Sequence, residues 1–120
     1  MKRSLLAIAA AVFLVTSIAG CSTASETVEL SADTILIDVR TPAEYGAGHL
    51  DGATLLDLNG GDFAAALPTL DPAAEYAVYC KSGNRSGQAV AMMEDAGFEN
   101  VIDLGSIDEA AASTQIEVVQ

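Results

Sequence analysis

The residues with the clearest capacity for chemistry lie between Cys80 and Ser86. A cysteine is nucleophilic as its thiolate, and a helix N-terminus with nearby cations lowers the pKa of such a thiol. Lys81 and Arg85 follow Cys80 within five positions, and they are two of only three basic residues beyond position 20. Gly83 allows the positive φ that a tight loop needs. This segment, the Cys80 loop (residues 80–86), therefore predicts a nucleophile in an anion-binding loop. The predicted anion-binding residues are Lys81, Ser82, Gly83, Asn84, Arg85 and Ser86. A buried structural cysteine before a Gly-Asn turn is the alternative.

A second polar cluster lies about forty residues upstream of the loop. Asp38 and Arg40 flank Val39 at the end of an apolar run, and Glu44 follows across a short turn. We expect Arg40 to pair with Glu44, and Asp38 to accept hydrogen bonds that orient neighbouring loops. His49 has no Cys or His partner at ligand spacing, so we expect it to pack and hydrogen-bond rather than to bind a metal.

The elements around these residues alternate between strand and helix patterns. The predicted strands are 34–39, 53–58, 75–80 and 100–104, with 116–119 as a closing edge strand. The predicted helices are 42–45, 63–67, 86–96 and 106–112, with N-caps at Thr41, Asp62 and Ser106, the last in a capping box with Glu109. Such alternation predicts an α/β fold whose central, mainly parallel sheet carries helices on both faces. Cys80 ends a central strand, where ligands bind in such sheets.

The N-terminus has the layout of a secretory signal. Lys2 and Arg3 precede an apolar run at 5–15, and Ile18-Ala19-Gly20-Cys21 resembles the lipobox of bacterial lipoproteins. The sequence thus predicts a signal peptide over 1–20, acylation of Cys21, a tether over 21–28 and a domain over 29–120. The protein would be extracytoplasmic and anchored to the lipid bilayer of the bacterial cell membrane. If Cys21 is not lipidated, a plain signal peptide would release a secreted protein.

Charge and cysteine content narrow the possible partners. The whole chain has 5 basic and 17 acidic residues, a net charge of −12. Removing residues 1–20 takes away two basic residues and no acidic one, which leaves 3 − 17 = −14. Such a surface repels nucleic acid, which we exclude as a partner. With Cys21 acylated, Cys80 is the one free thiol, so no internal disulfide could form.

Two blocks of the chain together resemble the signatures of single-domain rhodaneses, across roughly residues 28–104. The first block holds Asp38-Val39-Arg40, Glu44-Tyr45, Gly48-His49-Leu50 and Gly52-Ala53, and the second is Cys80-Lys81-Ser82-Gly83-Asn84-Arg85-Ser86. The resemblance implies a rhodanese-like three-layer fold. It also implies transfer of sulfane sulfur, without a cofactor, through a persulfide on Cys80. The donor would be thiosulfate or a persulfide, with Arg85 and Lys81 binding a small anionic donor, and the acceptor would be cyanide or a thiol, including a protein thiol.

The family pattern also has departures and competitors. Where relatives continue to a Gly-Gly and a Trp-containing helix, this chain reads Leu104-Gly105-Ser106-Ile107-Asp108, and it contains no Trp. A cysteine phosphatase or arsenate reductase places Arg six positions after Cys, whereas Arg85 lies five after Cys80, a ring better matched to one sulfur atom. The other alternative is a module that binds sulfane sulfur or senses redox state without turnover.

Overall fold

The computed structural model describes residues 26–120. The expected signal peptide and Cys21 lie outside the described residues, as does most of the expected tether. The elements are β1 (Ile35–Asp38), α1 (Pro42–Ala47), β2 (His49–Leu50), β3 (Thr54–Leu55), α2 (Asp62–Ala66), η1 (Leu67–Thr69), β4 (Tyr76–Cys80), α3 (Asn84–Asp95), β5 (Val101–Ser106), α4 (Ile107–Thr114) and β6 (Val118–Val119). No helix within residues 26–120 has the length and apolar content needed to cross a membrane.

The main sheet is parallel and has the order β3-β1-β4-β5. All five residues of β4 are buried, because this strand has a neighbour on each side and a layer on each face. The alternation of its side chains divides the core in two. Val78 and Cys80 lie in one apolar cluster with residues of α2 and α3, whereas Ala77 and Tyr79 lie in another with residues of α4.

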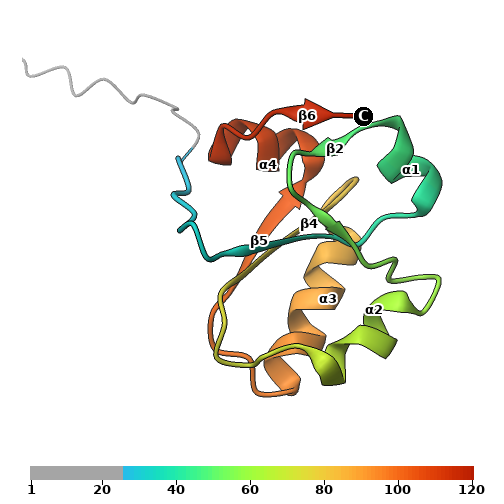
Figure 1. The fold of residues 1–120 in the computed structure, drawn as a ribbon, viewed down its shortest axis with the longest axis vertical. Coiled ribbons are helices and arrows are strands. Elements are labelled where there is room, and N and C mark those ends of the chain that lie inside the picture. The colour runs from blue at the N-terminus through green and yellow to red at the C-terminus, as the bar shows by residue number, and fades with distance from the viewer. Residues whose placement is uncertain (1–25) are drawn as a thin grey trace, which may run out of the picture.

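These two clusters make the domain a three-layer structure. In Figure 1, α2 and α3 lie on one side of the sheet, and α4 with the β2–β6 pair lies on the other. The predicted α/β fold, with a parallel sheet between helices, is confirmed. Because β1, β3 and β4 run parallel, their carboxyl ends lie at the same edge of the sheet, where a ligand site is expected.

Local caps explain where the helices begin. The hydroxyl of Thr41 accepts a hydrogen bond from the amide of Glu44, and the carboxylate of Glu44 accepts one from the amide of Thr41. Thr41 is thus the N-cap of α1, with Pro42 in the first turn, as the sequence predicts. Ser106 also caps α4 as predicted, but the Glu109 carboxylate bonds to the Ser106 hydroxyl rather than to its amide.

Four element predictions need correction. The predicted strand 53–58 is only Thr54–Leu55. Helix α3 begins at Asn84 and not at Ser86, because Gly83 serves as N-cap at φ +94°, in the left-handed region. Asp62 is the first residue of α2 rather than its cap, which is Gly61. The predicted closing strand is only Val118–Val119, and it pairs antiparallel with His49–Leu50 in a separate small sheet.

Candidate active site

Cys80 lies where β4 ends and the loop to α3 begins. Its sulfur accepts a hydrogen bond from the amide of Gly83 at 2.9 Å, and its thiol lies 3.5 Å from the hydroxyl of Ser86. Gly83 has the positive φ predicted from the sequence, and this conformation turns the chain into α3 directly after that amide. Cys80 itself is 0 % exposed. A donor can therefore reach the sulfur only when some of the residues that surround it shift.

The hydrogen bonds around Cys80 outweigh its burial. Burial by itself disfavours the thiolate and raises the pKa of the thiol. The side chain and amide of Ser86, with the amides of Gly83 and Ser82, favour the charged sulfur, and the net result is a pKa below the ordinary value. The loop thus favours a sulfur anion through the hydroxyl of Ser86 together with main-chain donors, in the manner of an oxyanion hole.

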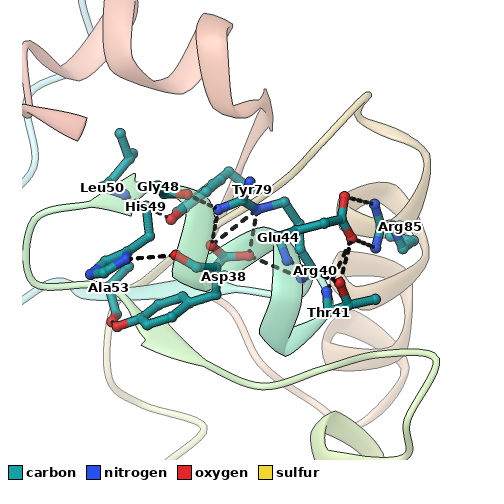
Figure 2. A network of polar contacts seen from close by, with 11 residues as sticks. Asp38, Arg40, Thr41, Glu44, Gly48, His49, Leu50, Ala53, Tyr79 and Arg85 are labelled. Atoms are coloured by element: carbon teal, nitrogen blue, oxygen red, sulfur yellow. Dashed lines mark hydrogen bonds and ion pairs between the residues drawn. The ribbon is translucent and has the colours of Figure 1, made fainter. Parts of the chain in front are cut away.

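The buried ion pair of the upstream block joins Arg40 to Asp38. Arg40 donates to both carboxylate oxygens of Asp38, at 2.7 Å for the shortest contact, and also to the carbonyl of Gly48 at 2.6 Å (Figure 2). Its guanidinium lies 5.6 Å from the ring centroid of Tyr79. The predicted Arg40–Glu44 ion pair is therefore wrong, since the two-residue spacing lets Arg40 fold back onto its own strand end.

Glu44 instead reaches across the site to the Cys80 loop. Its two oxygens accept hydrogen bonds from the two terminal nitrogens of Arg85, at 2.8 and 3.0 Å (Figure 2). This bidentate contact, aided by the cap at Thr41, lowers the pKa of Glu44 to about 2. The hydrogen bonds that Arg85 donates to Glu44 correspondingly raise the pKa of Arg85. Donor binding by Arg85 stays a prediction, but the structure adds a counter-ion that the sequence did not indicate.

Asp57 is a site residue that the sequence analysis missed. It follows β3, is 8 % exposed, and accepts the amide of Gly60 at 3.0 Å. Its charge is among those that raise the pKa of Arg85, after the contribution of Glu44. No clear sequence signal marked this role, because the predicted strand 53–58 contains Asp57, whereas the observed β3 ends at Leu55 and leaves Asp57 at the ligand-binding edge of the sheet. Lys81, by contrast, is exposed, and its donor-binding role stays a prediction.

His49 has the structural role that its sequence context predicts. Its ring stacks on Tyr45 with centroids 3.7 Å apart, and Nδ1 lies 2.9 Å from the Tyr45 carbonyl. Among the residues that the structure describes, no group of three or more His, Cys, Asp or Glu side chains could hold a metal ion.

The altered C-terminal region forms a wall beside the loop. The pairing of β4 with β5 shifts at Val78 and Tyr79, so that Cys80 pairs with Ser106. Such an irregularity bends a strand next to a site. Gly105 adopts φ +76°, and its Cα lies 3.7 Å from the position that a Cβ on Gly83 would take. Backbone rather than a large side chain therefore borders the loop at this point.

Fold and site together define a class: a parallel α/β domain with a strand–loop–helix cradle for one cysteine sulfur. The rhodanese-like domain model matches residues 23–112. The thiosulfate sulfurtransferase GlpE of Pseudomonas entomophila is 37 % identical over 81 residues, which cover 67 % of this chain and 72 % of that protein. A rhodanese structure from E. coli superimposes with a TM-score of 0.60 at 30 % identity, covering 72 % of this chain and 98 % of the other.

The chain belongs to the rhodanese-like domain family. The same domain is found within larger proteins. The probable adenylyltransferase/sulfurtransferase MoeZ of Mycobacterium tuberculosis is 40 % identical over 88 residues, which cover 70 % of this chain but only 22 % of MoeZ.

Proposed function

We propose that this domain is a sulfurtransferase that carries sulfane sulfur as a persulfide on Cys80. The observation that supports it most is the 2.9 Å hydrogen bond from the Gly83 amide to the sulfur, at the carboxyl edge of a parallel sheet. Relatives named as sulfurtransferases support the same reaction. The lowered pKa of Cys80 also supports it, because it favours the thiolate form that such a reaction needs.

The transfer takes place in two displacements. The Cys80 thiolate attacks the outer sulfur of the donor, a Cys80–sulfur bond forms, and the donor's own S–S bond breaks with its electron pair leaving on sulfite or a thiolate. An acceptor thiolate or cyanide then attacks the outer sulfur of the persulfide, and Cys80 leaves as thiolate. No oxidant is consumed, and the covalent intermediate gives ping-pong kinetics.

A turnover assay with two acceptors tests this proposal. The full chain is given thiosulfate or a persulfide as donor, with cyanide or a small thiol as acceptor, and product is followed over time. We expect turnover that Cys80→Ser abolishes. The control Ser113→Ala, which changes a residue of α4 outside the Cys80 loop, should leave turnover intact. Turnover that survives in Cys80→Ser contradicts the proposal.

The complete burial of Cys80 favours a second candidate, a module that stores or senses sulfane sulfur without turnover. A covered sulfur would exchange slowly with both donor and acceptor. In that case Cys80 gains a sulfur atom but no acceptor removes it at a useful rate, so the same assay separates the two functions.

We also propose that acylated Cys21 anchors the domain to the bilayer on the outer face of the bacterial membrane. The lipobox resemblance at 18–21 supports this location. Incorporation of a fatty-acid label that Cys21→Ala abolishes is the expected result. Release of unlabelled wild-type protein into the medium contradicts it.

A further inference from the structure

The charges around Cys80 bear on which sulfur donor the site can accept, and this inference rests on the proposed function. We infer that the donor is the persulfide of a thiol whose own groups are neutral or positively charged, and that Glu44 selects against small dianions by countering the charge of Arg85.

Arg85 is already committed to an anion of the protein. Both terminal nitrogens bond to Glu44, at 2.8 and 3.0 Å, and the side chains of Arg85 and Glu44 are only 18 % and 24 % exposed. A bidentate pair of this kind is oriented by α1, because Glu44 also closes the cap at Thr41. A donor anion would have to compete with this fixed carboxylate.

A count of formal charges extends the point to the whole loop. Arg85 and Lys81 contribute +2, whereas Glu44 and a Cys80 thiolate contribute −2, so the local sum is 0. Lys81 is exposed, so water screens its charge more than that of the half-buried groups. Apart from Arg85, Lys81 and Glu44, residues 26–120 hold one basic and 16 acidic residues. Thiosulfate, with two negative charges, approaches this site against repulsion.

A thiol persulfide presents the same sulfur atom with less charge. The amide of Gly83 bonds to the Cys80 sulfur itself, so its contribution does not require a donor with two negative charges. With a donor R–S–SH, the Cys80 thiolate attacks the outer sulfur and the S–S bond of the donor breaks. The leaving thiolate R–S⁻ takes up the proton of the outer sulfur, which gives R–SH and a persulfide anion on Cys80. An ammonium group near that sulfur, on a small thiol or a basic protein surface, would be attracted by the acidic surroundings.

The experiment compares how fast two donors load Cys80. The rate of sulfur gain is measured by intact mass with thiosulfate and with cysteamine persulfide, whose ammonium gives a low net charge. We expect the persulfide to load at least about tenfold faster at low salt. Replacing Glu44 by Gln should speed thiosulfate loading about tenfold and change persulfide loading less than about twofold. The matched control is Glu99→Gln, an exposed residue just before β5 at the opposite end of the sheet.

The wild-type protein provides a second readout that does not depend on a variant. Raising ionic strength from about 0.01 M to about 0.15 M should accelerate thiosulfate loading several-fold, because screening weakens the repulsion. Equal loading by both donors, or a thiosulfate rate that falls with salt, overturns the inference and leaves the proposed function standing. If Glu44→Gln changes both donors equally, Glu44 only fixes the loop, and the selectivity claim is again overturned. Loading by neither donor instead defeats the proposed function.

Discussion

The hydroxyl of Ser86 lies between the Cys80 sulfur, at 3.5 Å, and the carbonyl of Gly83, at 3.1 Å. As a thiol, Cys80 donates to Ser86, which donates onwards to Gly83. The amide of Gly87 also bonds to that carbonyl, at 3.2 Å. The hydroxyl can therefore rotate to donate to a sulfur anion without leaving the Gly83 carbonyl unsatisfied.

Replacing Ser86 by Ala should make Cys80 less reactive. The loss of one hydrogen bond to a charged sulfur, roughly 1–2 kcal/mol, should slow alkylation by iodoacetamide at neutral pH about tenfold and move the reactivity profile to higher pH. Ser82→Ala is the matched control, because Ser82 favours the thiolate through its amide, which this substitution keeps, and not through its hydroxyl. An unchanged alkylation profile in Ser86→Ala would contradict this role for the hydroxyl.

Two glycines of the same segment should respond oppositely to Ala. Gly83 has φ +94°, so a Cβ there is strained and should destabilise the fold by about 1–2 kcal/mol. Gly87 lies inside α3, and its added Cβ would meet Asp103 at an ordinary 3.8 Å. Gly87→Ala should therefore stabilise the protein by about 0.5–1 kcal/mol. Urea unfolding measures both, and similar effects of the two changes would be inconsistent with the observed loop geometry.

The Asp38–Arg40 pair should be essential to stability as a pair. Asp38 is 0 % exposed, so Arg40→Met leaves an uncompensated buried carboxylate and should cost about 3–5 kcal/mol. Adding Asp38→Asn removes that charge and should recover part of the loss. Chemical unfolding of the single and double variants gives the coupling energy, and additive effects would rule out a direct pair.

The Glu44–Arg85 pair should give a pH-dependent contribution to stability. The folded pKa of Glu44, about 2, lies below its ordinary 4.5, so the stabilisation is complete above pH 4.5 and disappears as pH falls towards 2. The wild-type protein should exceed Glu44→Gln in unfolding free energy by about 1–3 kcal/mol at neutral pH. The gap should close in acid. A gap that is constant with pH would show that the carboxylate charge does not matter.

The sequence was sufficient for the site's position but not for its ion pairs. Local signals fixed the Thr41 cap, the positive φ of Gly83 and the end of a strand at Cys80. The ion-pair partner of Glu44 could not be predicted from local signals. Arg40 is near in sequence, whereas Arg85 is 41 residues away and approaches Glu44 only when α1 packs beside the Cys80 loop.

Asp57 and the start of α3 were missed for related reasons. A single Asp after a weak strand has no spacing that marks it, and its relation to Arg85 depends on the order of the strands. The start of α3 was placed two residues late because Asn84 and Arg85 add nothing to the apolar stripe from which the helix was predicted.

The most direct test of the account is the intact mass of the full chain after brief exposure to cysteamine persulfide at neutral pH, with Cys80→Ala in parallel. We predict a gain of one sulfur atom in the wild-type protein, reversed by a thiol acceptor and absent in the variant. No gain with this donor or with thiosulfate, or the same gain in Cys80→Ala, would contradict the claim that the loop holds a reactive, sulfur-carrying cysteine.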